Sequence, residues 1–382
     1  MKIALIETHA VPGTWKDSLA LARELDALGA LVTIFTAACF PAGVATSGGV
    51  WRGFPALHAQ PNLLRKGARY LVATGRMVRE IRRGGFDVVH WQHFNVLPPI
   101  EALTASALGS LRPRLVMTVH DVEPWQAVRM QAAWMLRHTF RSAARLIVHH
   151  AANREHLRER FGVPGDHIRV VPRGGFQGFE TSPLSRAEAR GRIGVPGEGR
   201  LVLFFGEIRE EKNLPGLIRA LALVRRRIPD VRLLAAGRPR RVKPAAVAGE
   251  IRQVGLVDAA DFRPGYVPDE LVEAHFAAAD VVALPYRRIT QSAVLLQAMT
   301  SGRPVVATDG GALGPTVRDA GCGLVVPVDD EAALAEGLVR ILTDPELAHR
   351  LGERGRQAAT SRFTWERSAR ATWDVYEEVL AS

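Results

Sequence analysis

Several residue types and patterns are scarce in this chain of 382 residues, and each scarcity excludes a class of protein. The two cysteines, Cys39 and Cys322, stand far apart, so the sequence predicts neither a disulfide framework nor a thiolate metal cluster. No run of 18 apolar residues occurs that could form a membrane-spanning helix. The apolar run at the N-terminus stops at Glu7, too early for the core of a signal peptide. We therefore expect a cytoplasmic protein.

Fixed-spacing motifs for nucleotides and metals are also missing. The sequence contains neither G-x-G-x-x-G nor G-x-x-x-x-G-K-[ST], which disfavours a dinucleotide oxidoreductase and a P-loop phosphotransferase. No two aspartates stand two positions apart, and the 12 histidines form no H-E-x-x-H. These gaps favour a protein with no bound metal and no separate cofactor.

The charge of the chain is concentrated in its first half. Residues 1–178 hold 22 Lys+Arg and 12 Asp+Glu, a net charge of 22 − 12 = +10. Residues 179–382 hold 28 and 27, a net charge of +1. This asymmetry suggests that the first half meets something anionic, either a nucleic acid or a membrane surface.

Short apolar runs alternate with helical patterns along the whole sequence, which is typical of parallel α/β sheets whose strands are buried on both faces. The predicted strands cover residues 2–6, 30–36, 87–91, 115–120, 146–149, 168–172, 201–205, 231–237, 261–264, 281–285 and 304–308. Glycine and proline interrupt the pattern at 174–178 and 195–199. The fold class is therefore α/β, with two doubly wound Rossmann-like domains facing a central cleft.

The predicted domain boundaries follow from these interruptions. Residues 1–178 form the first domain, 179–364 form a linker and the second domain, and 365–382 form a C-terminal helix that can pack back on the first domain. In doubly wound domains, ligands bind at the carboxyl ends of the strands. The segments that follow the predicted strands are therefore the candidates for a ligand site.

Two cations follow the first strand of the second domain. Arg209 and Lys212 lie between a strand that ends at Gly206 and a helix that begins near Leu214. A phosphate would be bound there by the helix N-terminus and by a guanidinium group. The alternative is a solvated loop in which both cations pair with neighbouring glutamates.

A second polar loop follows the strand at 281–285. An apolar helix is predicted to start near Ser292, and Gln297 lies about one turn further along it. The amides around Gln291 would form another anion-binding helix N-terminus, although an ordinary loop followed by a core helix fits the same pattern. Glycines 310 and 311 then allow a close backbone approach after the strand at 304–308.

The order and spacing of five segments over 205–327 resemble the donor half of the GT-B glycosyltransferases, in the large retaining group called family 4. These segments are FGEIREEKNL at 205–214, GYVP at 265–268, AADVVALPY at 278–286, AMTSGRPVVATDGG at 298–311 and GCGLVVP at 321–327. Residues 87–90, 116–122 and 170–175 match the acceptor half more loosely. The resemblance implies a nucleoside-diphosphate sugar as donor substrate.

The resemblance also implies roles for individual residues. It places at the donor Gly206, Arg209, Lys212, Tyr266, Val267, Thr290, Gln291, Ser292 and Gln297, and on the acceptor side Pro12, Gly13, His120 and Asp121. Arg209 and Lys212 neutralise the leaving diphosphate together with the amides of 290–292, while Tyr266 and Val267 flank the nucleobase. His120 lies beside the donor sugar and counts with the two cations as catalytic. Alternatively, His120 is a hydrogen-bonded core histidine and Asp121 is a helix or turn cap.

One feature departs from the family pattern. The family has two glutamates eight residues apart before the Ala-Met pair, and here these positions are Ile289 and Gln297, with a Thr-Gln-Ser loop between them. Glutamine can still bind ribose hydroxyls. The implied activity is metal-independent retaining transfer of a hexose to a saccharide or lipid-linked acceptor, in polysaccharide or glycoconjugate biosynthesis. A nucleotide-sugar epimerase and a non-catalytic nucleotide-binding homologue are the alternatives.

The basic first half contains an amphipathic helix at Leu63–Arg83. On a wheel of 100° per residue one side carries the arginines, and the other carries apolar residues that include Leu71. The arginines are Arg65, Arg69, Arg76, Arg79 and Arg83. They indicate either docking on the anionic inner face of the plasma membrane or the solvated face of an ordinary helix. Nucleic-acid binding is disfavoured, because no recognition motif and no interleaved aromatic residues accompany the stripe.

Overall fold

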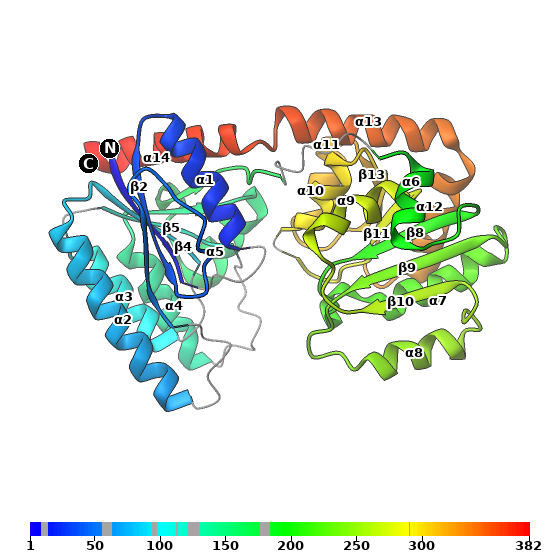
Figure 1. Cartoon of the computed structure of the whole chain (residues 1–382), viewed down its shortest axis with the longest axis horizontal. Coiled ribbons are helices and arrows are strands. Elements are labelled where there is room, and N and C mark those ends of the chain that lie inside the picture. The colour runs from blue at the N-terminus through cyan, green and yellow to red at the C-terminus, as the bar shows by residue number, and fades with distance from the viewer. Residues whose placement is uncertain are drawn as a thin grey trace. The chain divides into compact units, whose positions relative to one another are not determined.

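The chain folds into two compact units, each built on a fully parallel sheet (Figure 1). The computed structural model describes residues 1–8, 14–55, 63–93, 98–111, 114–120, 130–175, 184–289 and 291–382. Unit 1 comprises Met1–Gly174 and Trp365–Ser382, and unit 2 comprises Gly175–Thr364. The domain boundary predicted at residue 178 lies outside the described residues.

Unit 1 contains a seven-stranded sheet in the order β3-β2-β1-β4-β5-β6-β7. Its strands are β1 (Lys2–Glu7), β2 (Leu31–Ala37), β3 (Val50–Phe54), β4 (Val88–His93), β5 (Arg114–Thr118), β6 (Arg145–Val148) and β7 (Ile168–Val170). The strand order reverses between β1 and β4. In doubly wound sheets, that switch point is where ligands bind at the carboxyl ends of the strands.

The helices of unit 1 cover both faces of this sheet. They are α1 (Trp15–Ala27), α2 (Leu63–Arg83), α3 (Pro98–Gly109), α4 (Met130–Ser142), α5 (Ala151–Phe161) and α14 (Trp365–Ala381). The connections through α1 and through α2 run in opposite directions along the sheet, so right-handed crossovers place these helices on opposite faces. α14 packs against α1, and α3 packs against both α2 and α4 (Figure 1).

Unit 2 contains a six-stranded sheet in the order β10-β9-β8-β11-β12-β13. Its strands are β8 (Arg200–Phe205), β9 (Val231–Gly237), β10 (Ala260–Pro264), β11 (Val281–Leu284), β12 (Val305–Thr308) and β13 (Gly323–Val326). Here the order reverses between β8 and β11, where Val202 lies opposite Val281. The two predicted donor loops follow these two strands.

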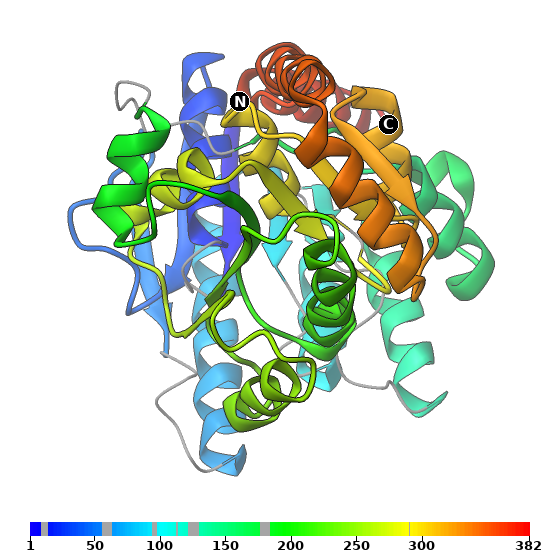
Figure 2. The same cartoon turned by 90° about the vertical axis from the view of Figure 1, so that its right-hand side faces the viewer.

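Eight helices in the described part of unit 2 enclose that sheet (Figure 2). They are α6 (Arg186–Ile193), α7 (Leu214–Arg225), α8 (Pro244–Gln253), α9 (Asp269–Ala278), α10 (Ala293–Thr300), α11 (Leu313–Ala320), α12 (Glu331–Thr343) and α13 (Pro345–Ser361). α7 packs against α8 and α12, and α10 packs against α13.

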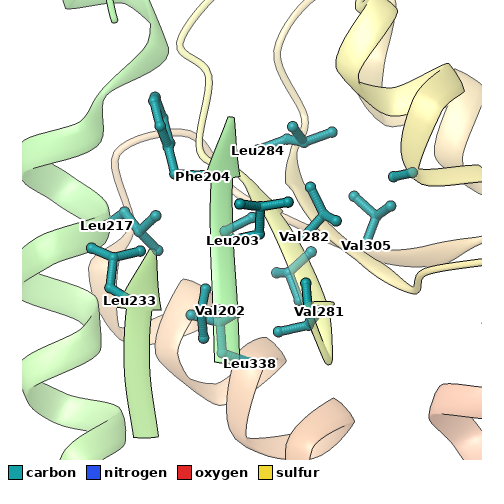
Figure 3. Packing of buried hydrophobic residues seen from close by; sticks show 14 of the residues in the cluster. Val202, Leu203, Phe204, Leu217, Leu233, Val281, Val282, Leu284, Val305 and Leu338 are labelled. Carbon is teal, nitrogen blue, oxygen red and sulfur yellow. The ribbon is translucent and has the colours of Figure 1, made fainter. Parts of the chain in front are cut away.

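Continuous apolar runs explain why the central strands of unit 2 are buried on both faces. Val202, Leu203 and Phe204 are fully buried, and Leu217 and Leu338 from the covering helices pack in the same cluster (Figure 3). Burying one such side chain contributes about 1.5–3 kcal/mol. This core fixes the strand ends from which the candidate site is built.

The predicted strands are present with ends displaced by one or two residues, but two strands had not been predicted. β3 and β13 are the outermost strands of their sheets. Arg52 and Gly53 interrupt the apolar run of β3, and the apolar run of β13 is only three residues long, Leu324–Val326, after a glycine.

Candidate functional site

The switch point of unit 2 brings together the two loops that the sequence had marked for a phosphate. The loop after β8 meets the loop after β11, where the amide of Arg287 donates to the carbonyl oxygen of Glu211 at 2.8 Å. The ammonium of Lys212 lies over the ring of Tyr286, 5.1 Å from its centroid. A cation in this position interacts favourably with the aromatic face. Arg209, Lys212 and the start of α10 therefore occupy one region of unit 2.

Lys212 is a buried cation, only 6% exposed. Burial, and to a smaller extent the neighbouring Arg209, lower the pKa of Lys212 to about 7, while Glu207 and Glu211 oppose the shift. Among the described residues, no carboxylate lies within 4.0 Å of its Nζ. The predicted alternative, in which both cations pair with neighbouring glutamates, therefore does not describe Lys212.

Arg209 is held differently. Its guanidinium lies 3.8 Å from a carboxylate oxygen of Glu207 and 3.3 Å from one of Glu211, and its side chain is 15% exposed. These two carboxylates stabilise the charge of Arg209, which lies close to Lys212 and would otherwise be repelled by it. An incoming anion would thus meet one partly neutralised guanidinium and one buried ammonium.

Gly206 supplies the space that Lys212 occupies. Its φ of +92° is a conformation that favours glycine. A Cβ at this position would lie 3.2 Å from Cγ2 of Val294 and 3.3 Å from Nζ of Lys212. The backbone conformation therefore favours glycine at the end of β8, and a Cβ there would crowd both Val294 and the ammonium.

The N-terminus of α10 adds backbone donors beside the two cations. Ser292 caps the helix, because its Oγ accepts a hydrogen bond from the amide of Leu295 at 3.2 Å. Gln291 precedes it and is partly buried. Thr290 lies outside the described residues. The amides near Ser292 point out of the helix end, where negative charge is stabilised.

Gln297 lies further along α10 and is 7% exposed. Its Nε2 donates to Oγ of Ser301 at 3.3 Å, whereas its buried Oε1 accepts no hydrogen bond within the described part of the chain. A buried acceptor without a donor is costly, which makes it a position that a ligand hydroxyl would satisfy. Ile289, at the other glutamate position, is 8% exposed and belongs to the hydrophobic core.

Tyr266 and Val267 stand apart from this group. They follow β10, two strands away from β8. Tyr266 is 58% exposed, and its hydroxyl donates to Asp269 at 2.9 Å. Partial burial and this hydrogen bond raise the pKa of Tyr266 to about 12. Within the described residues the hydroxyl of Tyr266 contacts Asp269 and not the loop of Lys212, so its role beside a nucleobase stays a prediction.

In unit 1, His120 belongs to a hydrogen-bonded series at the ends of neighbouring strands. Its Nε2 lies 3.2 Å from Oε1 of Gln92, and its Nδ1 lies 3.2 Å from Nε2 of His149. Nδ1 of His149 lies 2.9 Å from the carbonyl oxygen of Val171. The contacts at both ends have oxygen acceptors, so Nε2 of His120 and Nδ1 of His149 are the donors there.

The same series continues into the core of unit 1. Gln92 also contacts the ring of His90, which is fully buried. Nδ1 of His90 lies 2.5 Å from the hydroxyl of Tyr376 on α14, and its Nε2 lies 2.7 Å from Oγ1 of Thr118. Sequence reasoning missed Gln92 and His149 as site residues. Their position at the ends of β4 and β6 was the available signal.

A buried ion pair lies near the start of unit 1. The guanidinium of Arg173 bonds the carboxylate of Asp17 on α1, and both side chains are almost fully buried. Ser18 donates to the buried carboxylate of Glu7, at the end of β1, at 3.2 Å. Sequence reasoning missed this pair as well. Pro12, Gly13 and Asp121, the remaining acceptor-side predictions, lie outside the described residues.

α2 spans the predicted residues and presents its arginines outward. All five of the predicted arginines, Arg65, Arg69, Arg76, Arg79 and Arg83, are exposed. Tyr70 and Met77 are buried against the sheet as expected. Leu71, which the wheel places at the border of the apolar side, is 47% exposed.

The described residues contain no group of three or more His, Cys, Asp or Glu side chains that could hold a metal ion. Within the same residues, no helix is both long and apolar enough to cross a membrane.

Two family models match the chain. The model described as glycosyl transferases group 1 matches residues 185–358, and the model described as glycosyltransferase family 4 matches residues 18–174. A relative named D-inositol 3-phosphate glycosyltransferase, from Saccharomonospora viridis, is 34% identical over 248 residues, which are 63% of this chain and 57% of the relative. The chain spans about half the length of the curated relatives it matches.

Two solved structures share the fold along the chain. Sucrose-phosphate synthase from Thermosynechococcus elongatus has a TM-score of 0.78 and 22% identity, covering 100% of this chain and 99% of that one. The Anabaena protein HepE in complex with UDP and glucose has a TM-score of 0.78 and 19% identity, covering 99% and 100%. These likenesses show the GT-B fold of two Rossmann-like α/β domains.

Proposed function

The chain belongs to the group 1, family 4-like glycosyltransferases, and from that premise we propose that it moves a hexose from a nucleoside-diphosphate sugar to a saccharide or lipid-linked acceptor. The observation that carries the proposal is the pair of cations, Arg209 and Lys212, beside the capped N-terminus of α10. This group offers two positive charges and backbone donors to a single anion.

The donor diphosphate is the ligand that best fits this group. Lys212 has no carboxylate partner within 4.0 Å in the described part of unit 2, so a phosphate oxygen would supply the missing counter-charge. Arg209 binds phosphate oxygens through its planar guanidinium, and the amides at Gln291 and Ser292 bind the same group. We include Gly206 and Thr290 in this site because of the family match.

The nucleoside half of the donor would occupy the neighbouring positions. Oε1 of Gln297 is a buried acceptor that a ribose hydroxyl can satisfy. Tyr266 and Val267 are proposed to flank the base on the basis of the family match. The Anabaena structure contains UDP and glucose, so UDP-glucose is the first donor to test.

The reaction that this site can support is transfer with retention. The bond between the anomeric carbon and the phosphate oxygen breaks, and its electron pair stays on the diphosphate, where Arg209 and Lys212 stabilise the charge. The acceptor oxygen forms the new bond on the same face of the sugar, and its proton passes to the leaving phosphate oxygen. His120 is proposed to lie beside the sugar, with Pro12, Gly13 and Asp121 on the acceptor side.

The first experiment measures nucleotide release from UDP-, GDP- and dTDP-sugars, with and without acceptors that include an inositol phosphate. Arg209→Ala and Lys212→Ala should each lower kcat by about a hundredfold, the usual effect of removing one group that stabilises a developing negative charge. Arg240→Ala is the matched control, because its 62% exposed side chain also contacts Glu207, at 3.4 Å.

The outcomes separate this proposal from its alternatives. Release of an isomerised nucleotide sugar would indicate an epimerase, and binding without turnover would indicate a non-catalytic homologue. Unchanged kcat in both variants would refute the donor site. Retention is read from the anomeric proton of the first-formed product by NMR, and an inverted product would refute the proposed stereochemistry.

A further inference from the structure

Three neighbouring helices of unit 1, α2, α3 and α4, form a continuous layer (Figure 1). A Cβ on Gly67 of α2 would lie 4.0 Å from Cδ1 of Ile100 on α3. On the other side of α3, Oγ of Ser106 lies 2.7 Å from Nε2 of His138 on α4. These two contacts fix which side of each helix faces its neighbour, and hence which side faces outward.

The outward side of this layer carries large apolar residues. Nine large hydrophobic residues are exposed in the described part of the chain, and four of them stand on α2, α3 and α4. They are Leu71 (47%), Val72 (56%), Leu103 (66%) and Trp134 (62%). Single exposed apolar residues need no explanation, but four on adjacent helices mark an interaction surface.

Helical spacing relates these residues to the contacts between the helices. Leu103 precedes Ser106 by three residues, and Trp134 precedes His138 by four. Each therefore lies one helical turn from the contact between α3 and α4. On α2, Val72 follows Arg69 by three residues and precedes Arg76 by four, so it lies on the same side of the helix as both arginines. The apolar residues therefore lie among the arginines and are not segregated from them.

The cations of the same surface are available to a partner. Arg69, Arg76, Arg79 and Arg83 are exposed, and none of them forms an ion pair with another described residue. α2 holds seven Lys and Arg residues and one acidic residue. α4 adds the exposed Arg137 and Arg141. We call this surface, with its four apolar residues, the α2–α4 face.

We propose that the α2–α4 face docks on an anionic lipid bilayer. Phosphate headgroups would neutralise the arginines, at about 1 kcal/mol for each basic residue near the surface. Leu71, Val72, Leu103 and Trp134 would enter the boundary between headgroups and acyl chains, where tryptophan is favoured. A face that only contacts water would explain why the arginines are exposed, but it would not explain the exposure of the four apolar residues. The inference does not depend on the reaction proposed above.

The test is flotation of the full chain with vesicles of phosphatidylcholine, alone or mixed two to one with phosphatidylglycerol, at low and high salt. One variant combines Arg69→Ser, Arg76→Ser and Arg79→Ser, and a second combines Leu103→Ser and Trp134→Ser. The matched control combines Arg252→Ser and Val257→Ser, an exposed cation and an exposed apolar residue of unit 2. Because all substituted side chains are exposed, we expect the variants to have the same Tm as wild type. Equal Tm values would verify that the variants are folded.

The proposal predicts different losses for the two variants. The arginine variant should bind anionic vesicles about a hundredfold more weakly at low salt, because each arginine contributes roughly fivefold. The apolar variant should bind at low salt but lose the binding that wild type retains at high salt, where surface charges are screened. Wild type that does not float with anionic vesicles, or variants that float like the control, would overturn the proposal.

Discussion

At the scale of single residues, the proposed donor site depends on a buried ammonium group. Lys212 is 6% exposed and contacts the face of Tyr286, with Gly206 leaving room for it. Its charge is disfavoured by burial and by Arg209 until an anion arrives. Binding of the donor and protonation of Lys212 should therefore be coupled.

This coupling predicts proton uptake when a nucleoside diphosphate binds. Because the pKa of Lys212 is about 7 in the folded protein, the group is mostly neutral at pH 8 and becomes charged beside a diphosphate. Calorimetric titration at pH 8 with UDP, GDP or dTDP, in buffers of different ionisation enthalpy, should show uptake of nearly one proton. Lys212→Met should abolish the uptake, and Arg240→Ala should retain it. Equal uptake by Lys212→Met would contradict this prediction.

The same pKa has a consequence for stability. The folded pKa of about 7 lies below the ordinary lysine value of 10.5, so the unfolded chain binds more protons between these values. Lys212 therefore destabilises the fold fully below about pH 7, and the cost disappears as the pH rises toward 10.5. Lys212→Met should raise the Tm at pH 6 and give little gain near pH 10. A gain that does not depend on pH would show that the ammonium is not the cause.

Alanine substitutions at two glycines, Gly206 and Gly255, distinguish a loss of stability from a loss of nucleotide binding. Gly206→Ala places a Cβ 3.3 Å from Nζ of Lys212 at a φ of +92°, whereas Gly255→Ala at a φ of +72° meets no atom within 4 Å. Both should lose roughly 1–2 kcal/mol of stability from the left-handed conformation. Only Gly206→Ala should also weaken nucleoside-diphosphate binding in the same titration. Equal affinities in the two variants would contradict the proposed site.

At the scale of elements, the ends of neighbouring strands determine which side chains meet. Gln92 on β4, His120 after β5 and His149 after β6 form one hydrogen-bonded series, because parallel strands end at the same edge of a sheet. α14, at the C-terminal end of the chain, extends the series, because the hydroxyl of Tyr376 contacts Nδ1 of His90. Glu378 adds ion pairs to Arg145 and to Arg169, which lowers the pKa of that carboxyl.

His149 should act as a positioning residue for His120. With its Nδ1 donating to the carbonyl of Val171, it fixes the contact that orients the His120 ring. His149→Leu should lower kcat at least tenfold with little change in KM for the donor, and should shift the pH profile of kcat. His150→Ser is the matched control, because His150 caps α5 and serine is also a favoured cap. A change confined to donor KM would contradict this role.

The sequence predicted the central elements because each carries its own signal. β8 and β11 are continuous apolar runs, and the Arg209–Lys212 loop follows one of them. The strands β3 and β13 were missed because Arg52 and Gly53 interrupt the apolar run of β3 and because the apolar run of β13, Leu324–Val326, is only three residues long. The His120–His149 contact was not predictable, because it depends on the register of β5 against β6 and on side-chain directions beyond both strand ends.

At the scale of the whole molecule, the excess positive charge lies in unit 1 and the proposed donor-binding cations lie in unit 2. The net charge of +10 in residues 1–178 includes the arginines of the α2–α4 face, while the cations proposed for the donor stand in unit 2. Vesicle binding and donor binding should therefore be separable by mutation. The arginine variant of α2 should retain the wild-type affinity for nucleoside diphosphates, measured by titration without vesicles. A matching loss of affinity would contradict this division.

Metal independence is a second prediction at this scale. The charge of the leaving diphosphate is proposed to be stabilised by Arg209, Lys212 and the amides of α10, so activity should survive removal of divalent metals. Nucleotide release in excess EDTA should remain within about twofold of the untreated rate, with a known metal-dependent transferase as control. A loss of activity that added Mg²⁺ or Mn²⁺ restores would contradict the assignment.

The most direct test of the central claim compares the affinities of UDP and uridine, GDP and guanosine, and dTDP and thymidine, for wild type, Arg209→Ala and Lys212→Ala. If these two residues bind the diphosphate, wild type should bind at least one diphosphate at least tenfold more tightly than its nucleoside. Each variant should lose that preference while binding the nucleoside as wild type does. Variants that retain the preference, or wild type without any preference, would contradict the account.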